Sequence, residues 1–190
     1  MTVPKLIAFD LDGTIWSPDM YQLCGGGIFF KTKYESDYLL SYSNLGPPFS
    51  GDGTKNILDK KGTPIRLLGV VRSLLHDLKH NPEWKDTAVA WVSRTDEPAW
   101  AMELLALFKT TGGDSIGTVA HSSQIYHGNK INHFNALKRE YPNIEFSEML
   151  FFDNEYDNIR SVSTLGVKCV FCPDGVTEMA WKDGLKLFTT

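Results

Sequence analysis

Short apolar runs alternate with amphipathic stretches along most of the chain, and this alternation constrains the fold more than any other feature. The apolar runs have the length and composition of buried strands and cover residues 6–9, 87–92, 116–120, 149–152 and 167–171. Helical periodicity is found at residues 68–80, 97–110, 131–140, 158–165 and 177–187. Strands that alternate with helices form a parallel sheet covered by helices on both faces. The sequence therefore predicts an α/β protein with a Rossmann-like, three-layer α/β/α architecture and a mostly parallel sheet.

The alternation is interrupted after the first strand, at about residues 18–66. This stretch is rich in Gly, Ser, Asp, Asn and Pro and has no helical period. Residues 28–30 are predicted as a short strand, and residues 56–67 as a hairpin that turns at Lys60-Lys61-Gly62. A structureless loop of this length is uncommon in a compact domain, so we expect a small, partly ordered, cap-like insertion. The 190 residues suit one domain with that appendage.

Polar residues follow three of the predicted strands at the point where each strand ends, and a lysine opens a later helix. These residues are Asp10 and Asp12, then Ser93, Arg94 and Thr95, then Asp153 and Asn154, with Lys130 at the helix. In a parallel sheet the carboxyl ends of the strands share one edge, where open α/β sheets bind their ligands. We therefore expect one site built from residues that are scattered through the chain.

Asp10 and Asp12 are the most informative pair in this set. Residues i and i+2 of an extended chain project to the same side, so both carboxylates lean into one shared space. Two like charges at close range are costly unless a cation or a shared proton relieves them. The pair therefore predicts a metal ion, a shared proton, or both.

Charge and composition limit the classes of partner and location. The chain has 23 acidic and 19 basic residues, and nucleic-acid backbones usually bind a basic face, so nucleic acid is not expected. No apolar run approaches the roughly 18 residues of a membrane helix, so no membrane span is expected. Only five residues precede the first strand, so no signal peptide is expected. Three cysteines, an odd number, argue against a disulfide framework and favour a reducing, cytoplasmic or nuclear location.

Taken in order, the strand-end residues resemble the motifs of the haloacid dehalogenase (HAD) superfamily of phosphohydrolases. The superfamily's Asp-x-Asp-x-Thr motif matches residues 10–14, its Ser or Thr matches Ser93, its Lys matches Lys130, and its acidic cluster matches Asp153-Asn154. Longer strings at residues 9–16, 93–95, 130–134 and 151–154, the last together with Asn158-Ile159, are similar to the magnesium-dependent phosphatase 1 group. The resemblance covers nearly the whole chain and implies a single HAD-like phosphatase domain over residues 1–190.

The resemblance implies a magnesium-dependent phosphomonoester hydrolase with a divided set of roles. Asp10 would be the nucleophile that forms an aspartyl-phosphate, and Asp12 the general acid and base. Ser93, Arg94 and Lys130 would bind the phosphate. The substrate would be a small phosphorylated metabolite or a phosphoprotein, since the group is associated with phosphotyrosine and with phosphorylated sugars such as fructosamine 6-phosphate.

The implied magnesium ligands are Asp10, the backbone carbonyl of Asp12, and Asn154. At Asn154 the chain departs from the group, which usually has a second Asp there. HAD phosphatases that act on RNA polymerase tails share the Asp-Asn pair, and in them the second residue is the ligand. An Asn carbonyl oxygen is an acceptable magnesium ligand. The resemblance therefore implies that Asn154 binds the metal directly and that Asp153 lies behind it, paired with Lys130.

Two other interpretations stay open at this point. One is another HAD-type phosphotransferase, although a dehalogenase does not need Asp12, because halide leaves without a proton, and a phosphomutase normally has a larger cap. The other is an inactive phosphate-binding module of the same fold, which Asn154 permits and which the intact Asp10, Asp12 and Lys130 argue against. The choice between phosphotyrosine and sugar substrates and the oligomeric state are left open.

Other polar residues have simpler interpretations. Thr95 is expected to cap the helix that follows it. Cys169 and Cys172 form a Cys-x-x-Cys in what has the composition of a buried strand, so packing is favoured over redox chemistry or zinc binding. Three histidines lack the spacing of metal ligands and are expected to be structural or exposed; they are His121, His127 and His133.

Overall fold

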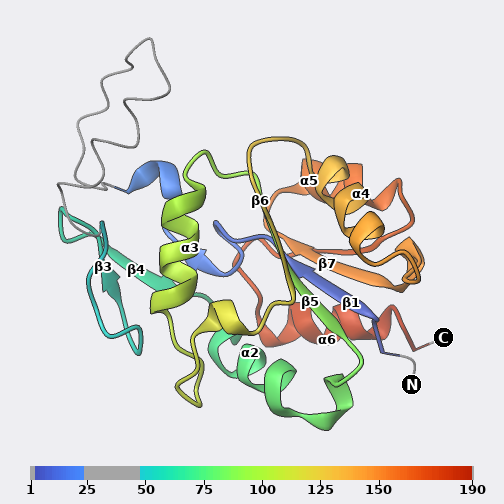
Figure 1. The fold of residues 1–190 in the computed structure, drawn as a ribbon, viewed down its shortest axis with the longest axis horizontal. Helices are drawn as coiled ribbons and strands as arrows, with labels where there is room; N and C mark the ends of the chain where they lie inside the picture. Colours follow the sequence, from blue (N-terminus) through green and yellow to red (C-terminus); the bar gives the residue numbers. More distant parts are fainter. Residues whose placement is uncertain (1–2, 24–47, 190) are drawn as a thin grey trace.

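The computed structural model describes residues 3–23 and 48–189. Its centre is a five-stranded sheet in the order β6-β5-β1-β7-β8, in which every neighbouring pair is parallel (Figure 1). The strands are β1 (Leu6–Phe9), β5 (Ala88–Ser93), β6 (Ser122–Ile125), β7 (Met149–Asp153) and β8 (Lys168–Phe171). The predicted α/β class with a mostly parallel sheet is confirmed.

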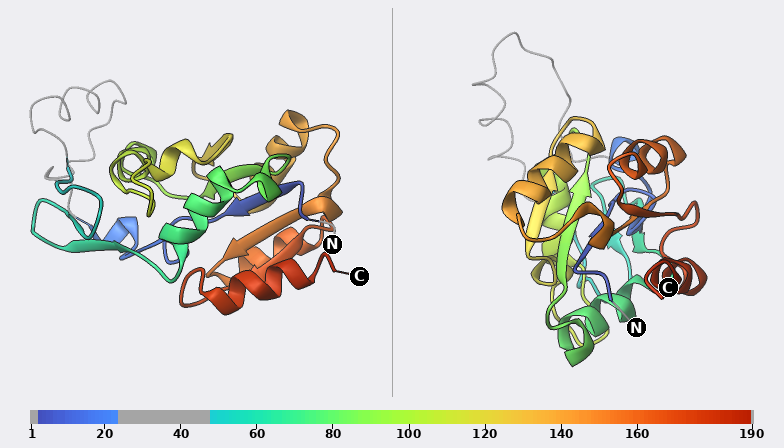
Figure 2. Two further views of the ribbon diagram at one scale, coloured as in Figure 1. Left: turned by 90° about the horizontal axis from the view of Figure 1, so that it is seen from below. Right: turned by 90° about the vertical axis from the view of Figure 1, so that its right-hand side faces the viewer.

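Helices cover both faces of this sheet, as Figure 2 shows. They are α2 (Val71–His80), α3 (Pro98–Leu107), α4 (Lys130–Glu140), α5 (Tyr156–Ser163) and α6 (Glu178–Lys186). In β1, Ile7 and Phe9 join the core formed with α2, α3 and α6, whereas Leu6 and Ala8 join the core formed with α4 and α5. A strand buried on both faces needs apolar residues at every position, which explains why β1 is an unbroken apolar run.

The predicted hairpin is present and belongs to a second, small sheet. Its strands are β2 (Trp16–Ser17), β3 (Ile57–Leu58) and β4 (Pro64–Leu67), paired antiparallel in the order β2-β4-β3. At the turn, the Asp59 carboxylate accepts the N–H groups of Lys61 and Thr63 at 2.9 and 2.7 Å. Gly62 has a φ of +82°, which is a conformation that glycine adopts at little cost. The strand predicted at 28–30 lies outside the described residues.

Two predictions about the edges of the main sheet are wrong. Residues Ile116–Thr118, predicted within a strand, form the 3₁₀ turn η4, and the edge strand β6 follows at Ser122–Ile125. β6 pairs only with β5, and a strand with one neighbour tolerates polar residues that hide its strand character. β8 lies at the opposite edge and is only partly buried, so the interpretation of residues 167–172 as a buried strand also fails.

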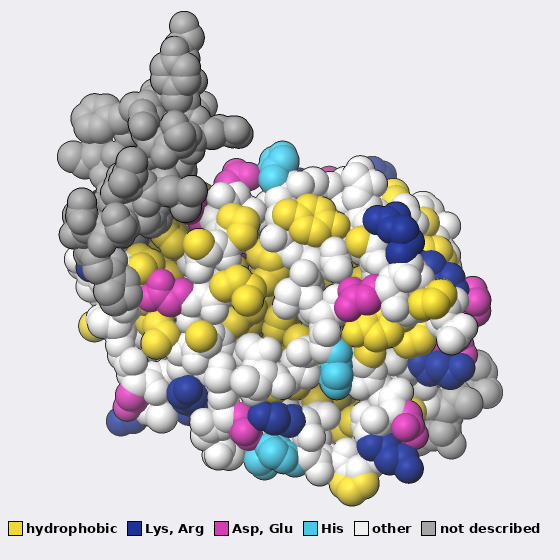
Figure 3. Space-filling view, viewed as in Figure 1, with side chains coloured by type: hydrophobic (Ala, Val, Ile, Leu, Met, Phe, Trp, Pro, Cys, Tyr) yellow, Lys and Arg dark blue, Asp and Glu magenta, His cyan; other side chains and the backbone are white. Residues whose placement is uncertain are grey.

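The surface and the helices show two further general features. On the face in Figure 3, basic and acidic side chains are interspersed. None of the helices in the described ranges combines the length and the apolar character that crossing a bilayer requires. At the carboxyl ends of β1 and β5 lies the pocket that holds the predicted site residues.

Candidate active site

A pocket of about 400 Å³ opens at the carboxyl ends of the central strands. Five of the predicted site residues line it: Asp10, Asp12, Ser93, Arg94 and Lys130. They come from the end of β1, the end of β5 and the first residue of α4. The parallel sheet thus brings together residues that are up to 120 positions apart in the chain.

A buried charge cluster forms the floor of this site. The Lys130 ammonium group contacts the Asp10 carboxylate, donates to the Val92 carbonyl oxygen at 2.6 Å, and lies 3.3 Å from Asp153 Oδ2. Lys130 is 2% exposed and Asp153 is fully buried. Burial raises the pKa of Asp10 and of Asp153, while the Lys130 charge opposes that rise. Two carboxylates face one ammonium group. When both are ionised, the cluster has one negative charge in excess, which a further cation would balance.

Asp12 has different surroundings from Asp10, although the two side chains face the same pocket. The indole N–H of Trp16 donates to Asp12 Oδ1 at 2.8 Å, and the backbone N–H of Met20 also donates to this carboxylate. Burial raises the pKa of Asp12 to about 6, against the effect of these donors. A carboxyl with such a pKa exchanges its proton near neutral pH, which suits an acid and base. No role was predicted for Trp16, although it ends the 9–16 string that resembles the family and lies four residues after Asp12.

Asn154 lies against the turn that follows Asp12 and does not line the pocket itself. Its backbone N–H donates to Thr14 Oγ1 at 3.0 Å, and its side-chain oxygen accepts from the same hydroxyl at 3.3 Å. Gly13, with a φ of +70°, makes this approach possible, because a Cβ atom there would lie 2.2 Å from Asn154 Nδ2. The ligand role of Asn154 stays a prediction, and the structure places its amide beside the Asp12–Thr14 backbone.

Arg94 is held over the pocket by Asn158, which belongs to the strings that resemble the family but for which no role was predicted. The Arg94 guanidinium donates to Asn158 Oδ1 at 2.9 Å, and Asn158 Nδ2 donates to both Asp153 oxygens at 3.0 and 3.2 Å. Asn158 is 6% exposed and lies on the inward face of α5 with Val162. A buried amide on an amphipathic helix, five residues after Asp153, was the available signal. The Asp153–Asn158–Arg94 chain links the charge cluster to the phosphate-binding candidate.

Ser93 and Thr95 shape the loop between β5 and α3. The buried Ser93 hydroxyl accepts the backbone N–H of Thr95 at 3.2 Å, and Thr95 Oγ1 accepts the N–H of Glu97 at 3.1 Å. The helix begins at Pro98, and Glu97 is its N-cap. The prediction that Thr95 caps α3 is therefore wrong, because its bond lies in the turn before the helix. Ser93 stays a phosphate-binding prediction.

The donors in the site suit a hard divalent cation. The predicted ligands are the Asp10 carboxylate, the Asp12 backbone carbonyl and the Asn154 amide beside the pocket, all of which offer oxygen. No histidine or cysteine of the described ranges lines the pocket, so it lacks the softer donors that favour zinc. Burial raises the pKa of the Cys169 and Cys172 thiols to about 12, as expected of cysteines that pack rather than react.

The sequence is similar to a known family and to several known proteins. The sequence model of the acid phosphatase family matches residues 2–190, which is nearly the whole chain. The chain belongs to this family. It is 34% identical over 188 residues to human magnesium-dependent phosphatase 1, a match that covers 98% of this chain and 88% of the relative. It is also 27% identical over 167 residues to a HAD-like hydrolase superfamily protein of Schizosaccharomyces pombe, covering 86% of this chain and 83% of that protein.

Solved structures confirm the fold of this acid phosphatase family member. A haloacid dehalogenase-like family hydrolase from Xanthomonas campestris matches with a TM-score of 0.55 and 11% identity over 92% of this chain and 85% of that one. The N-terminal part of a Bacteroides fragilis protein, containing a phosphatase domain complexed with Mg, matches with a TM-score of 0.53 and 19% identity. That match covers 98% of this chain and 39% of the other. The resemblance to the HAD superfamily and its magnesium-dependent phosphatase 1 group is thereby confirmed.

Proposed function

We propose that the protein is a magnesium-dependent phosphomonoesterase that works through an aspartyl-phosphate on Asp10. One observation carries this proposal: Asp10 and Asp12 face the same pocket with different partners. Asp10 contacts the buried Lys130, whereas Asp12 accepts from the Trp16 indole. Two neighbouring carboxyls with different surroundings take different roles in acid and base chemistry.

In the first step, a carboxylate oxygen of Asp10 attacks phosphorus and the bond from phosphorus to the ester oxygen breaks. The leaving oxygen takes the proton of Asp12, so the alcohol departs neutral. Lys130 faces the attacking carboxylate and stabilises negative charge on the phosphoryl oxygens, and Arg94 at the pocket wall is placed to donate hydrogen bonds to them.

In the second step, Asp12 is a carboxylate and takes a proton from a water molecule. The water oxygen attacks phosphorus, the bond from phosphorus to Asp10 breaks, and inorganic phosphate leaves. Asp12 ends protonated and Asp10 ends as a carboxylate, so both residues return to their starting forms. The Trp16 donor fixes the Asp12 carboxyl in one orientation for both steps.

Asp10, the Asp12 carbonyl and Asn154 would hold Mg²⁺. Their oxygen donors and the excess of carboxylate over ammonium charge in the cluster support this assignment, as does the name of the human relative. When bound, the ion would neutralise charge between the anionic nucleophile and the anionic phosphate.

We extend the proposal to substrates of the phosphotyrosine or phosphorylated-sugar type. Four acidic residues line the pocket wall, and they favour substrates whose leaving group carries no further negative charge. These residues are Asp19, Asp96, Glu97 and Glu155. These carboxylates would repel a second phosphate or a carboxylate on the leaving group, and the affinity for such a substrate would be lower. Met20 and Tyr21 also line the pocket and offer apolar contact to a ring.

The proposal is tested by hydrolysis of p-nitrophenyl phosphate with and without magnesium. Wild-type protein is expected to turn over only with the ion, and Asp10→Asn is expected to lose at least about 10³-fold in kcat. Borohydride reduction of the acid-quenched enzyme, followed by mass spectrometry, should locate the acyl phosphate at position 10.

Asp157→Asn is the matched control, since Asp157 is exposed at the start of α5 and does not line the pocket. Full activity of Asp10→Asn with native circular dichroism would refute the nucleophile assignment. Phosphate binding without any turnover by the wild type would instead favour an inactive phosphate-binding module. A panel of phosphotyrosine peptides with basic or acidic flanks, together with phosphorylated sugars, then tests the substrate class.

A further inference from the structure

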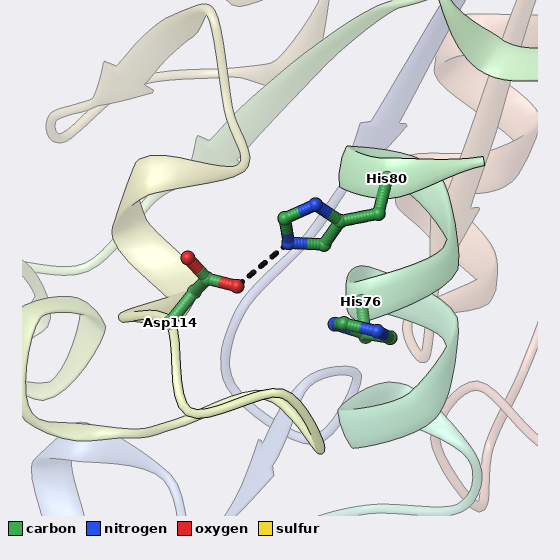
Figure 4. A group of neighbouring side chains, drawn as sticks. All are labelled: His76, His80 and Asp114. Carbon is green, nitrogen blue, oxygen red and sulfur yellow. Dashed lines mark hydrogen bonds and ion pairs between the residues drawn. The ribbon is translucent and has the colours of Figure 1, made fainter. Parts of the chain in front are cut away.

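Three side chains that could ligate a metal ion lie together at the C-terminal half of α2, away from the active-site pocket. They are His76 and His80 of α2 and Asp114 of the loop between α3 and η4. One ligand atom from each lies within 4.8 Å of the other two. Figure 4 shows both imidazole rings beside the Asp114 carboxylate. Among the residues that the structure describes, no other three such side chains gather this closely.

The helix and the loop create this arrangement by independent means. His76 and His80 are four residues apart, so they project from the same face of α2, and their ring centroids are 4.6 Å apart. On the loop side, Gly112 lies against the His76 ring: a Cβ atom there would be 2.3 Å from His76 Cε1. A larger residue at position 112 would displace either the His76 ring or the loop, and in both cases it would disturb the arrangement.

The hydrogen bonds of the cluster leave one histidine unsatisfied. His80 Nε2 and Asp114 Oδ2 are 2.8 Å apart, and the other oxygen of Asp114 accepts from Lys79 at 2.8 Å. His76 Nδ1 is buried and has no hydrogen-bond partner. A buried polar atom without a partner is costly, and a nearby ligand is one way to relieve that cost. The His76 ring is therefore free of polar contacts that would oppose a small rotation toward a bound ion.

We propose that His76, His80 and Asp114 form a binding site for a borderline divalent transition-metal ion, zinc above all. Two imidazoles and one carboxylate, with a fourth position open to water, make up a donor set that zinc accepts in tetrahedral geometry. Histidines spaced i, i+4 on one helix face are a recurrent zinc-binding arrangement. In such a site the donor atoms lie about 3.4 Å apart, so modest side-chain rotations suffice to close it. Magnesium is not expected here, because it prefers oxygen donors.

The site would tie α2 to the loop between α3 and η4. This loop already contacts α2 through the Thr111 N–H, which donates to the Arg72 carbonyl oxygen at 3.3 Å. Arg72 also donates to the Gly53 carbonyl oxygen at 2.6 Å, and the Lys109 N–H donates to the same oxygen at 3.0 Å. A bound ion would add a further link to this junction of helix, loop and small-sheet region, and its expected effect is stabilisation of the folded chain.

The test is a calorimetric titration of the EDTA-stripped Asp10→Asn protein with zinc sulfate. Excess magnesium is present, so that active-site carboxylates do not take up zinc. One equivalent is expected to bind, and zinc at 100 times its Kd is expected to raise the Tm by about 5–10 °C. X-ray absorption at the zinc edge should show imidazole scattering from two histidines.

His76→Ala and Asp114→Asn are expected to weaken zinc binding by at least roughly 10- to 100-fold. His127→Ala is the matched control: His127 and Asp96 also form a histidine–carboxylate pair at 2.8 Å, but without a second histidine. Metal-free melting curves verify that each variant is folded. Equal zinc affinity in the Asp10→Asn protein and in both site variants made in that protein, or the absence of imidazole scattering, would overturn the proposal.

Discussion

The pocket over Asp10 and the histidine cluster on α2 both join carboxylates with a lysine, but they differ in donors and in burial. The pocket offers oxygen donors around Lys130, which is 2% exposed. The cluster offers two imidazoles and one carboxylate, and the side chain of its lysine, Lys79, is 27% exposed. The type of donor atom decides which metal ion each region can bind. The degree of burial decides how much stability is lost when one charge of an ion pair is removed. A lysine beside carboxylates is thus proposed to serve catalysis in the pocket and to accompany a bound ion in the cluster.

The largest difference between the two regions is expected when their lysines, Lys130 and Lys79, are each replaced. Lys130→Met removes the only cation that the structure places beside two buried carboxylates, so kcat should fall by about 10²-fold or more and stability by about 3 kcal/mol. Lys79→Met breaks a half-exposed ion pair and should cost less than about 1 kcal/mol. Urea unfolding and p-nitrophenyl phosphate assays of both variants measure this difference. Similar losses of stability in the two would show that burial does not separate the regions.

Asn154→Ala tests whether the pocket takes its metal through the amide beside Gly13. Loss of this oxygen donor should raise the magnesium concentration for half-maximal activity by about 10- to 100-fold. The zinc titration of the α2 cluster should not change, because Asn154 does not belong to it. An unaltered magnesium requirement would remove Asn154 from the ligand set.

Arg94→Ala tests the phosphate contact at the pocket wall. A hydrogen bond to a charged group is worth about 1.5–3 kcal/mol, and the half-exposed Arg94 belongs at the low end, so kcat/KM should fall roughly tenfold. Asn158→Ala should act in the same direction, because it frees the guanidinium that Asn158 holds. Arg160→Ala, an exposed arginine of the same helix, is the control. An effect of Arg160→Ala as large as that of Arg94→Ala would point to general electrostatics rather than to a contact.

The smallest expected effect concerns the cluster. Lys79 lies 2.8 Å from Asp114 and repels a divalent ion at the same carboxylate. Lys79→Met should therefore tighten zinc binding by roughly fivefold, with part of the Coulomb gain offset by looser positioning of Asp114. Calorimetric titrations of wild-type and variant protein give the comparison. Weaker zinc binding by the variant would mean that the lysine orients Asp114 more than it repels the ion.

Much of the fold and part of the site could be predicted from the sequence, because both depend on local pattern. Unbroken apolar runs located β1, β5 and β7, and the strand-end rule brought Asp10, Asp12, Ser93 and Lys130 to one edge. The pattern failed at β6, where an edge strand is built from polar residues. It also failed at Thr95, where the helix begins two residues later than a Thr95 cap would require.

The missed residues depend on contacts that no local pattern encodes. No role was predicted for Asn158, because its partners, Arg94 and Asp153, belong to other elements. The α2 cluster was overlooked because Asp114 meets His80 across 34 residues. Its closeness depends on how a loop packs on the helix and on the small volume of Gly112.

The sequence by itself determined the alternation of strands and helices, the shared edge of the parallel sheet and the identity of the carboxylates there. Periodicity and chain direction are local properties, so they can be deduced without a structure. Only the tertiary structure decided that Asp10 contacts Lys130 while Asp12 contacts Trp16, and that two histidines of α2 meet Asp114. Partners and burial depend on how elements pack, and packing is set by the whole chain at once.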